Sequence, residues 1–299
     1  MKSLPAVLRA VLLVALVALA VPGASVHPTT LSLSRGDNAK SVDFEDGVVW
    51  LLVLGSDAEG DEAIKDGRTD VIELIGIHSD TGSAAGIGIP RDAWVKLPGG
   101  RARINEALSQ GGAGLTARAV EGLVGIAPDY VLVTGFEGFL AMAEAVGEVE
   151  VRVPRAFETD EGLAVEQGLN RFDADQALDF ARSRGDLPGA DFDRMANQQA
   201  LLLGYLRALR AHEGQAGFME DVTFAGLGGL DTDLAPTDLY RLAQAVTQVD
   251  PAKATGCLVL GTPITTEGDA DVIRPDKALA RRLGRDAEGD AALDPACRG

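Results

Sequence analysis

Basic residues are scarce in this sequence of 299 residues, where 27 Lys and Arg stand against 45 Asp and Glu and leave a formal net charge of −18. So acidic a chain disfavours a broad surface that binds nucleic acid or another polyanion. Any local cluster of arginines therefore requires an explanation of its own. The remaining composition, 46% hydrophobic and 24% charged, excludes a disordered or collagen-like chain.

Histidine is scarce too, and several catalytic signatures are absent. The three histidines, His27, His78 and His212, are scattered along the chain. A zinc site or a Ser-His-Asp triad needs imidazole placed beside defined partners, so the sequence disfavours both. The P-loop, G-x-S-x-G, H-E-x-x-H and C-x-x-C patterns do not occur. These absences remove several common enzyme classes before any positive signal is considered.

One long hydrophobic run lies at the N-terminus. Lys2 and Arg9 precede 17 uncharged residues, Ala10 to Val26, which are mostly Leu, Val and Ala. A basic flank before an apolar run indicates export and places the rest of the chain outside the cytoplasm. Two outcomes stay open. Residues 1–26 are either a retained signal-anchor in the cell membrane, giving a single-pass protein, or a signal peptide whose cleavage releases a secreted protein.

Only two cysteines are present, Cys257 and Cys297, and they are 40 residues apart. An oxidising compartment favours a structural disulfide, and closing that loop contributes roughly 4 kcal/mol on the chain-entropy model. Two unpaired thiols are the alternative. No linker-like composition divides the exported part, so we expect a short linker over residues 27–46 and a single extracytoplasmic domain over residues 47–299.

Apolar runs with polar ends predict an α/β fold. Strands are predicted over residues 48–54, 71–77 and 84–89, and their proximity in sequence favours neighbouring positions in one sheet. Further strands are predicted over 130–134, 149–153 and 257–260, and helices over 104–109, 115–124, 136–146 and 235–247. Capping signals at Asp173 with Gln176, and at Asp191, predict two more helices. The mixed order indicates a sheet layered with helices, whereas the polar stretch after Gly268 has no clear pattern.

Carboxylates and arginines gather at the ends of the first three predicted strands. Asp57 follows the first strand, Arg68 and Asp70 precede the second, and Arg91 with Asp92 follows the third. Two aspartates that meet at a strand end suit Mg²⁺, which takes one or two protein carboxylates and completes its shell with water and phosphate oxygens. Taken singly, each aspartate can equally be a turn or cap residue.

A second group of cations lies at the junction of two predicted helices. Arg182, Arg184 and Arg194 fall within 13 residues, and Gln198 shares a helix face with Arg194. Guanidinium groups grip phosphate oxygens bidentately and a helix N-terminus favours anions, so this group can form an oxyanion cradle. The alternative is a solvated set of surface salt bridges with three neighbouring aspartates, Asp186, Asp191 and Asp193.

Taken in order, these segments resemble the signature of the LytR-CpsA-Psr (LCP) family. The resemblance covers residues 48 to 212 and rests on order and spacing, since no single segment is specific. The matching segments are Leu54-Gly55-Ser56-Asp57, Arg68-Thr69-Asp70, Ile89-Pro90-Arg91-Asp92, Arg103-Ile104-Asn105-Glu106-Ala107, Ala177 to Arg184, and Asp191-Phe192-Asp193-Arg194 with Gln198-Gln199.

The resemblance implies a central mixed β-sheet flanked by helices, with an apolar tunnel that holds a polyprenyl tail. It implies a phosphotransferase that moves a glycopolymer from a polyprenyl-pyrophosphate carrier to peptidoglycan, forming a phosphodiester and releasing polyprenyl phosphate. The implied partners are the carrier-linked glycopolymer, the peptidoglycan acceptor and the membrane, but no nucleic acid; the implied cofactor is Mg²⁺ or Mn²⁺. The aliphatic runs 120–124 and 201–203 can line such a tunnel or pack the core.

Carried over by position, the resemblance assigns Asp57 and Asp70 to the metal. Arg91 is expected to stabilise charge in the transition state, and Asp57 or a metal-bound neighbour to assist deprotonation of the acceptor hydroxyl. The residues expected to contact the pyrophosphate are Arg68, Arg91, Arg103, Arg182, Arg184, Arg194 and Gln198. The chain departs from the family directly after Asp57, where Ala58-Glu59 stands in place of a small residue and an arginine.

Other functions stay open at this stage. A hydrolase that cleaves polyprenyl pyrophosphate could use the same site, with water replacing the sugar hydroxyl. A non-catalytic lipid-carrier binding or regulatory envelope protein would keep the tunnel but would not need both Asp57 and Asp70. Export, acidity and the lack of a helix-turn-helix pattern oppose a transcriptional role.

Overall fold

The computed structural model describes most of the region that follows the N-terminal hydrophobic run. The described residues are 29–36, 47–58, 63–184, 187–212, 215, 218, 222, 230–294 and 297. The segment 1–26, Glu59 and Asp186 lie outside these residues, so the expectations about them are not addressed. Within the described ranges, no helix combines the length and apolar character that crossing a bilayer requires.

Seven of the described strands form one mixed sheet in the order β12-β1-β7-β2-β3-β4-β13. Their bounds are β1 (Leu31–Arg35), β2 (Val49–Ser56), β3 (Thr69–His78), β4 (Ser83–Gly88), β7 (Tyr130–Thr134), β12 (Leu230–Thr232) and β13 (Ala254–Leu258). Strands β2, β3 and β4 are antiparallel neighbours, which confirms the adjacency predicted for the first three runs. Parallel pairs join β1 to β12, β2 to β7 and β4 to β13.

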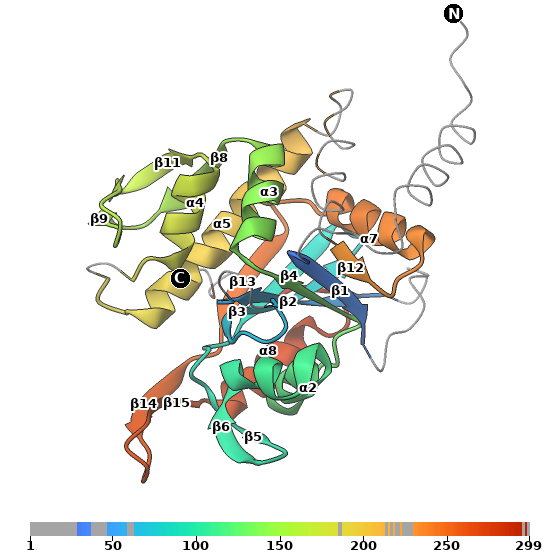
Figure 1. The fold of residues 1–299 in the computed structure, drawn as a ribbon. Helices are drawn as coiled ribbons and strands as arrows, with labels where there is room; N and C mark the ends of the chain where they lie inside the picture. The colour runs from blue at the N-terminus through green and yellow to red at the C-terminus, as the bar shows by residue number, and fades with distance from the viewer. Residues whose placement is uncertain are drawn as a thin grey trace, which may run out of the picture.

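Helices cover both faces of this sheet, as Figure 1 shows. One face packs against α2 (Ala107–Val124) and α8 (Lys277–Ala287). The other face lies under α5 (Asp191–His212) and α7 (Pro236–Gln248). Helices α3 (Phe136–Val146) and α4 (Ala174–Arg182) pack beside α5. This arrangement confirms the predicted α/β class with a central mixed sheet.

Short strand pairs and a single turn of 3-10 helix complete the described elements. Two of the pairs are β5 (Trp94–Leu97) with β6 (Gly100–Arg103) and β14 (Gly261–Thr265) with β15 (Asp271–Pro275). The other two are β8 (Val149–Val153) with β11 (Gly168–Phe172) and β9 (Phe157–Glu158) with β10 (Ala164–Val165). The 3-10 helix η2 (Ile104–Glu106) leads from β6 into α2.

The largest hydrophobic cluster of the described residues lies between the sheet and the α2–α8 pair. Leu52, Leu74 and Ile87 are fully buried there, as the continuous apolar runs of their strands require. Val120 and Val124 of α2 belong to this cluster, so the run 120–124 packs the core. The two helices predicted over 104–109 and 115–124 are η2 followed by one helix, α2, which is interrupted at Gly111 and Gly112.

The range expected to be a linker, residues 27–46, contains a strand of the central sheet. Strand β1 pairs with β7 and β12, and Leu31 and Leu33 are buried. The alternation Leu31-Ser-Leu-Ser is the period-two pattern of a half-buried strand, and it is the signal that could have identified β1. The domain therefore begins earlier in the chain than residue 47.

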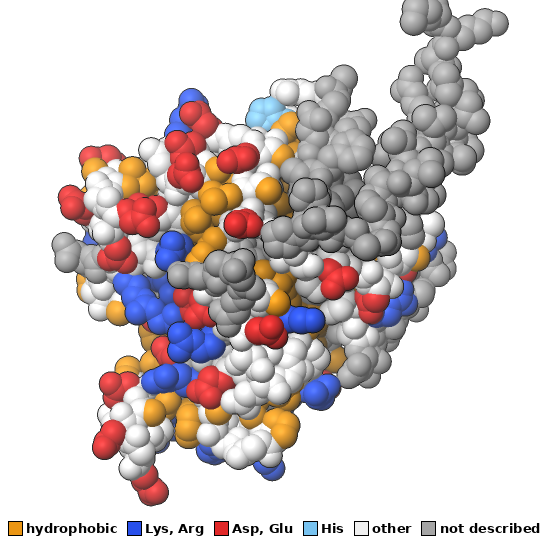
Figure 2. All heavy atoms as spheres, in the orientation of Figure 1, with side chains coloured by type: hydrophobic (Ala, Val, Ile, Leu, Met, Phe, Trp, Pro, Cys, Tyr) orange, Lys and Arg blue, Asp and Glu red, His pale blue; other side chains and the backbone are white. Residues whose placement is uncertain are grey.

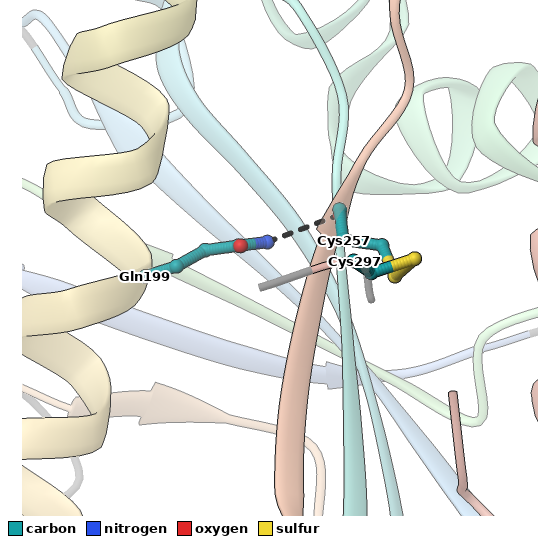
Figure 3. The surroundings of a disulfide bond; sticks show 3 residues. All are labelled: Gln199, Cys257 and Cys297. Atoms are coloured by element: carbon teal, nitrogen blue, oxygen red, sulfur yellow. Dashed lines mark hydrogen bonds between the residues drawn. A yellow bond between two sulfur atoms is a disulfide. The ribbon is translucent and has the colours of Figure 1, made fainter. Parts of the chain in front are cut away.

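The polar stretch after Gly268 also holds regular structure. It forms β15 and then α8, whose first turn is capped by the Asp276 carboxylate accepting the Leu279 N–H at 3.0 Å. Cys257 on β13 and Cys297 are joined by a disulfide, which confirms the predicted pairing. In Figure 3 the disulfide lies on one side of β13, while Gln199 of α5 approaches the strand from the other side.

Candidate functional site

Asp57 and Arg68 contact each other directly after the end of β2 and directly before the start of β3. The Asp57 N–H donates to the Arg68 carbonyl at 2.9 Å, and the Arg68 N–H donates to Asp57 Oδ1 at 2.6 Å. The Arg68 Nε donates to Asp57 Oδ2 at 3.3 Å, although the Arg68 side chain is 61% exposed. Both carboxylate oxygens of Asp57 therefore already accept a hydrogen bond from Arg68.

Arg91 is the centre of an ion-pair network at the end of β4. Its Nη1 donates to Asp70, and its Nε lies 3.7 Å from Asp191 Oδ1 and 3.8 Å from Asp92 Oδ2. The Asn105 N–H donates to the Arg91 carbonyl at 3.1 Å, which anchors the backbone of the turn. Burial lowers the pKa of Arg91, but the three carboxylates outweigh that effect and raise the pKa above its ordinary value. Arg91 is therefore charged at any physiological pH.

Arg194 brings a second, deeper cation into this network from α5. Its side chain is 3% exposed, and its Nη2 donates to Asp191 Oδ1 at 2.6 Å and to the Asp70 carbonyl at 3.4 Å. Burial lowers the pKa of Arg194, and the Asp191 charge opposes that shift. Asp191, predicted as the cap of this helix, is instead its first residue, and its carboxylate bridges Arg194 and Arg91.

Several buried polar atoms around this network have no hydrogen-bond partner among the described residues. In the network itself they are Arg91 Nε, Arg194 Nε and Asp191 Oδ2. Three more belong to neighbouring residues: Thr69 Oγ1, Asn105 Oδ1 and Asn197 Nδ2. An unsatisfied buried polar group costs about 1–3 kcal/mol, so it is uncommon without a functional reason. Neither Nε makes a hydrogen bond, although Arg91 Nε lies within ion-pair distance of Asp92 and Asp191, and guanidinium groups are suited to receiving an anionic ligand.

Arg103 connects this network to the β14–β15 hairpin. Its Nε lies 3.4 Å from Asp92 Oδ1, and its Nη2 donates to the Asp271 carbonyl at 2.8 Å. Burial raises the pKa of Asp92, and the Arg91 charge offsets this only in part. The sequence identified Arg103 and Asp92, but it offered no signal for Asp271, which is distant in the chain.

Arg182, Arg184 and Gln198 lie at the junction of α4 and α5. The Arg182 guanidinium carbon is 4.4 Å from the centroid of the Phe136 ring on α3, a cation–π contact. The Arg184 N–H donates to Asp160 at 3.0 Å, and its side chain is exposed. Gln198 is buried and donates to the Ala181 carbonyl at 2.9 Å, which holds the end of α4 against α5.

The predicted site residues thus form two separate ion-paired groups and a third set that belongs to neither. Asp70, Arg91, Arg103 and Arg194 share one network through Asp92 and Asp191, whereas Asp57 and Arg68 pair with each other. Arg182 and Arg184 make no described ion pair with either group. Figure 2 shows Lys and Arg side chains gathered between the region of α4 and α5 and the region of the β14–β15 hairpin. The salt-bridge alternative is therefore realised in part, because Asp191 pairs with Arg194.

The carboxylates of the site meet part of the requirements of a divalent cation. No group of three or more His, Cys, Asp or Glu side chains able to hold a metal occurs in the described part of the chain. Asp70 is 30% exposed and, among the described residues, one of its oxygens accepts no hydrogen bond. Mg²⁺ needs only one or two protein carboxylates when phosphate oxygens complete its shell, so the Asp70 carboxylate has the chemistry of one such ligand.

Glu73 is a buried carboxyl group that no site prediction included. It lies in the middle of β3, and burial raises its pKa to about 8, with the Gln199 hydrogen bond opposing the shift. Gln199 Nε2 donates at 3.2 Å both to Glu73 Oε2 and to the Cys257 carbonyl, the second contact being drawn in Figure 3. The available signal was that Glu73 alone interrupts the apolar run 71–77.

Comparison with known proteins places these observations in context. Residues 24–270 match the LytR_cpsA_psr family. A polyisoprenyl-teichoic acid–peptidoglycan teichoic acid transferase TagU from Bacillus anthracis (strain CDC 684 / NRRL 3495) is 29% identical over 196 residues, 65% of this chain and 63% of that protein. The TagU of Enterococcus faecalis (strain ATCC 700802 / V583) is 25% identical over 241 residues, 78% of this chain and 79% of that protein. The chain thus spans less than two thirds of the Bacillus relative.

Solved structures show the same fold. The crystal structure of Bacillus subtilis TagV superposes with a TM-score of 0.69 at 22% identity, covering 84% of this chain and 100% of that one. The LytR-CPS2A-psr family protein YwtF (TagT) with bound octaprenyl pyrophosphate lipid superposes with a TM-score of 0.62 at 20% identity, covering 83% of this chain and 92% of that one. At these identities the likeness concerns the fold alone.

Proposed function

Because the chain belongs to the LytR_cpsA_psr family, we propose that it transfers a glycopolymer from a polyprenyl-pyrophosphate carrier to peptidoglycan. Relatives named as polyisoprenyl-teichoic acid–peptidoglycan teichoic acid transferases support this reaction class. A phosphodiester to a sugar hydroxyl of peptidoglycan is the proposed product.

The observation that carries the proposal is the paired cation site of Arg91 and Arg194. Their side chains are 18% and 3% exposed, and each has a buried Nε without a hydrogen-bond partner among the described residues. A pyrophosphate offers several anionic oxygens to such donors, and phosphoryl transfer depends mainly on positioning and charge neutralisation.

In the proposed reaction, the acceptor hydroxyl oxygen bonds to the phosphorus that carries the glycopolymer. The bond from this phosphorus to the bridging oxygen breaks, and polyprenyl phosphate leaves with the electron pair. Arg91 and Arg194 donate to the phosphate oxygens as their negative charge increases. Arg68, Arg103, Arg182 and Arg184 lie further out and hold the rest of the charged headgroup, while Gln198 fixes the segment that bears Arg182.

The hydroxyl proton needs a carboxylate acceptor, and two residues qualify. Asp57 is the residue that the family resemblance favours, although Arg68 already donates to both of its oxygens. Asp92 lies between Arg91 and Arg103, and burial raises its pKa, which favours holding a proton. Replacing each aspartate by asparagine distinguishes them, since only loss of the true proton acceptor changes the pH dependence of transfer.

Asp70 and Asp57 are the proposed ligands of Mg²⁺ or Mn²⁺. When bound, such an ion neutralises phosphate charge and orients the phosphate oxygens. Asp70 would offer the oxygen that accepts no described hydrogen bond, and its other oxygen would keep its contact with Arg91. Retention of the N-terminal run as a membrane anchor and a tunnel for the polyprenyl tail are also part of the proposal, because the carrier is a membrane lipid.

The direct test is transfer of a labelled oligosaccharide from polyprenyl pyrophosphate to peptidoglycan fragments, with and without Mg²⁺. We expect a labelled glycan–peptidoglycan product that depends on the divalent ion and forms together with polyprenyl phosphate. Release of free oligosaccharide phosphate at the same rate without acceptor would instead identify a hydrolase. Binding of the carrier with neither product would contradict any catalytic role.

A further inference from the structure

An open cavity of about 420 Å³, exposed to solvent, lies between the β14–β15 hairpin and the turn that follows β4. Asp92 forms its wall on the side of the turn, and residues 263–265 and 271–273 form the wall on the side of the hairpin. The proposed chemistry uses none of the hairpin residues that line this space, but Asp92 on the opposite wall belongs to the Arg91 network. Asp92 therefore borders both the cavity and the cation site.

The hairpin is fixed against the site by several interactions. The Ile273 N–H donates to the Asp92 carbonyl at 2.9 Å, and a bridge pairs Ala93 with Ile273. Arg103 donates to the Asp271 carbonyl through two nitrogens, at 2.8 and 3.2 Å. These bonds join the turn that bears Arg91 and Asp92 to the hairpin, so the two walls of the cavity are held at a fixed position relative to each other.

The walls of the cavity combine two kinds of surface. Asp92 and Asp271 contribute carboxylates and Thr265 a hydroxyl, which donates to Asp271 Oδ1 at 2.9 Å. Ile264 and Ile273 contribute aliphatic surface. Carboxylates repel a phosphate but accept hydrogen bonds from hydroxyl groups, and aliphatic side chains pack against the apolar face of a sugar ring. The lining therefore suits a saccharide and opposes the pyrophosphate.

We propose that this cavity binds a sugar ring of the peptidoglycan acceptor and directs its hydroxyl toward the phosphate held by Arg91. The inference rests on the proposed function, since it names the place of the second substrate. A saccharide in this cavity could also belong to the glycopolymer of the donor. We favour the acceptor because the acidic walls lie beside the cation site, where they repel the phosphates of the donor but accept hydrogen bonds from an uncharged sugar.

The test fills the cavity without changing any residue of the cation site. Thr265→Trp places a large ring in the cavity, whereas Thr262→Trp makes the same change on the same strand at an exposed residue outside the cavity lining. With the full-length chain, we expect Thr265→Trp to raise the acceptor KM at least tenfold. The donor KM and the kcat at saturating acceptor should stay within about twofold of the unchanged protein, and Thr262→Trp should behave like the unchanged protein.

Two results would overturn the proposal in the transfer assay. One is an unchanged acceptor KM in Thr265→Trp, and the other is a loss of donor affinity by the same factor, which would assign the cavity to the donor. If the unchanged protein transfers nothing, the proposed function fails, and calorimetric binding of an unmodified peptidoglycan oligosaccharide then decides. Binding that only Thr265→Trp abolishes would support the subsite, and equal binding by all three proteins, or by none, would refute it.

Discussion

The two faces of the central sheet differ in the kinds of side chain that are buried against them. Under α2 and α8, leucine, isoleucine and valine side chains fill one large apolar cluster. Under α5, the buried residues include Glu73 of the sheet and Arg194, Asn197 and Gln198 of the helix. Burial of apolar area stabilises the fold, whereas each buried polar group costs free energy unless it is satisfied. The comparison leads us to expect that variants on the α2–α8 face affect mainly stability and that variants at the polar groups near α5 affect mainly the proposed transfer.

The buried residues of α8 and α5 differ in the same way as the two faces of the sheet. On α8 the buried residues Ala280, Leu283 and Ala287 form a stripe at helical spacing, as expected for a helix that only packs. On α5 the residue types at buried positions change along the helix, from Arg194 and Gln198 near its start to Leu201 and Gly204 further on. A variant on one side should therefore affect one property and spare the other.

The largest expected effect is a loss of transfer activity from a variant in the cation site on the α5 side. Arg91→Ala should lower transfer by about 10³-fold or more, because it removes a charged donor from the reacting phosphate, and a donor of this kind is worth about 10³ to 10⁵ in rate. Arg91→Lys should recover little of this activity, since an ammonium group cannot bridge phosphate oxygens with a planar fork. Steady-state transfer rates and thermal unfolding are the measurements.

Arg171→Ala is the matched control for Arg91→Ala. Arg171 is 70% exposed on β11 and pairs only with Glu150 in the described structure, so its loss should leave the transfer rate unchanged. If Arg91→Ala and Arg171→Ala lowered activity equally, or if Arg91→Ala lost activity only through unfolding, the assignment of the α5 side to chemistry would be wrong.

The second prediction concerns the stability of the α2–α8 side. Replacing Cys257 and Cys297 together by serine opens a loop of 40 residues and should lower the free energy of unfolding by roughly 4 kcal/mol. Below the unfolding temperature the transfer rate should stay within about threefold, because neither cysteine touches the cation site. Denaturant unfolding and transfer rates measured on the same preparation check both statements. A large loss of activity in a folded variant would contradict the separation of the two faces.

The smallest predicted effect concerns Glu73 and pH. Its pKa is raised by burial from 4.5 to about 8, so the folded state holds a proton that the unfolded state has released over this interval. Stability from this group is therefore present at low pH and is lost as pH rises between these values, with a slope of up to about 1.4 kcal/mol per pH unit. Above pH 8 the contribution should level off.

Glu73→Gln keeps the shape of the side chain and cannot ionise. Between pH 6 and 8 its free energy of unfolding should fall less steeply than that of the unchanged protein, as measured by denaturant titration at each pH. Glu161→Gln, a change at an exposed residue, should leave the slope as it was. Parallel slopes in the unchanged protein and Glu73→Gln would show that Glu73 is ionised in the folded state.

Local sequence patterns predicted much of the fold because many elements are defined by their own residues. The bounds of β7, α3 and β8 agree with the predicted ranges 130–134, 136–146 and 149–153. The capping box of Asp173 and Gln176 is present as predicted, with the Gln176 N–H donating to Asp173 at 2.9 Å. Strand β1 was missed because its period-two pattern is short and lies far from its partners in the chain.

The site was predictable only in part, because its contacts join segments that are distant in sequence. The order of motifs led to Arg91, Asp70 and Arg194, which the structure brings into one network. The sequence did not indicate that Arg103 would bind the Asp271 carbonyl, 168 residues away. The stacking of Arg182 on Phe136 was likewise unforeseen, since no local pattern links these residues.

The disulfide has a consequence for proteolysis. Cys257 and Cys297 enclose both strands of the β14–β15 hairpin and the whole of α8 within one covalent ring. The turn at the tip of the hairpin, residues 267–269, is exposed and so offers a protease its natural target. A single cut there would leave the two pieces joined through sulfur. The nicked chain would migrate as one species until a reductant separated it into two.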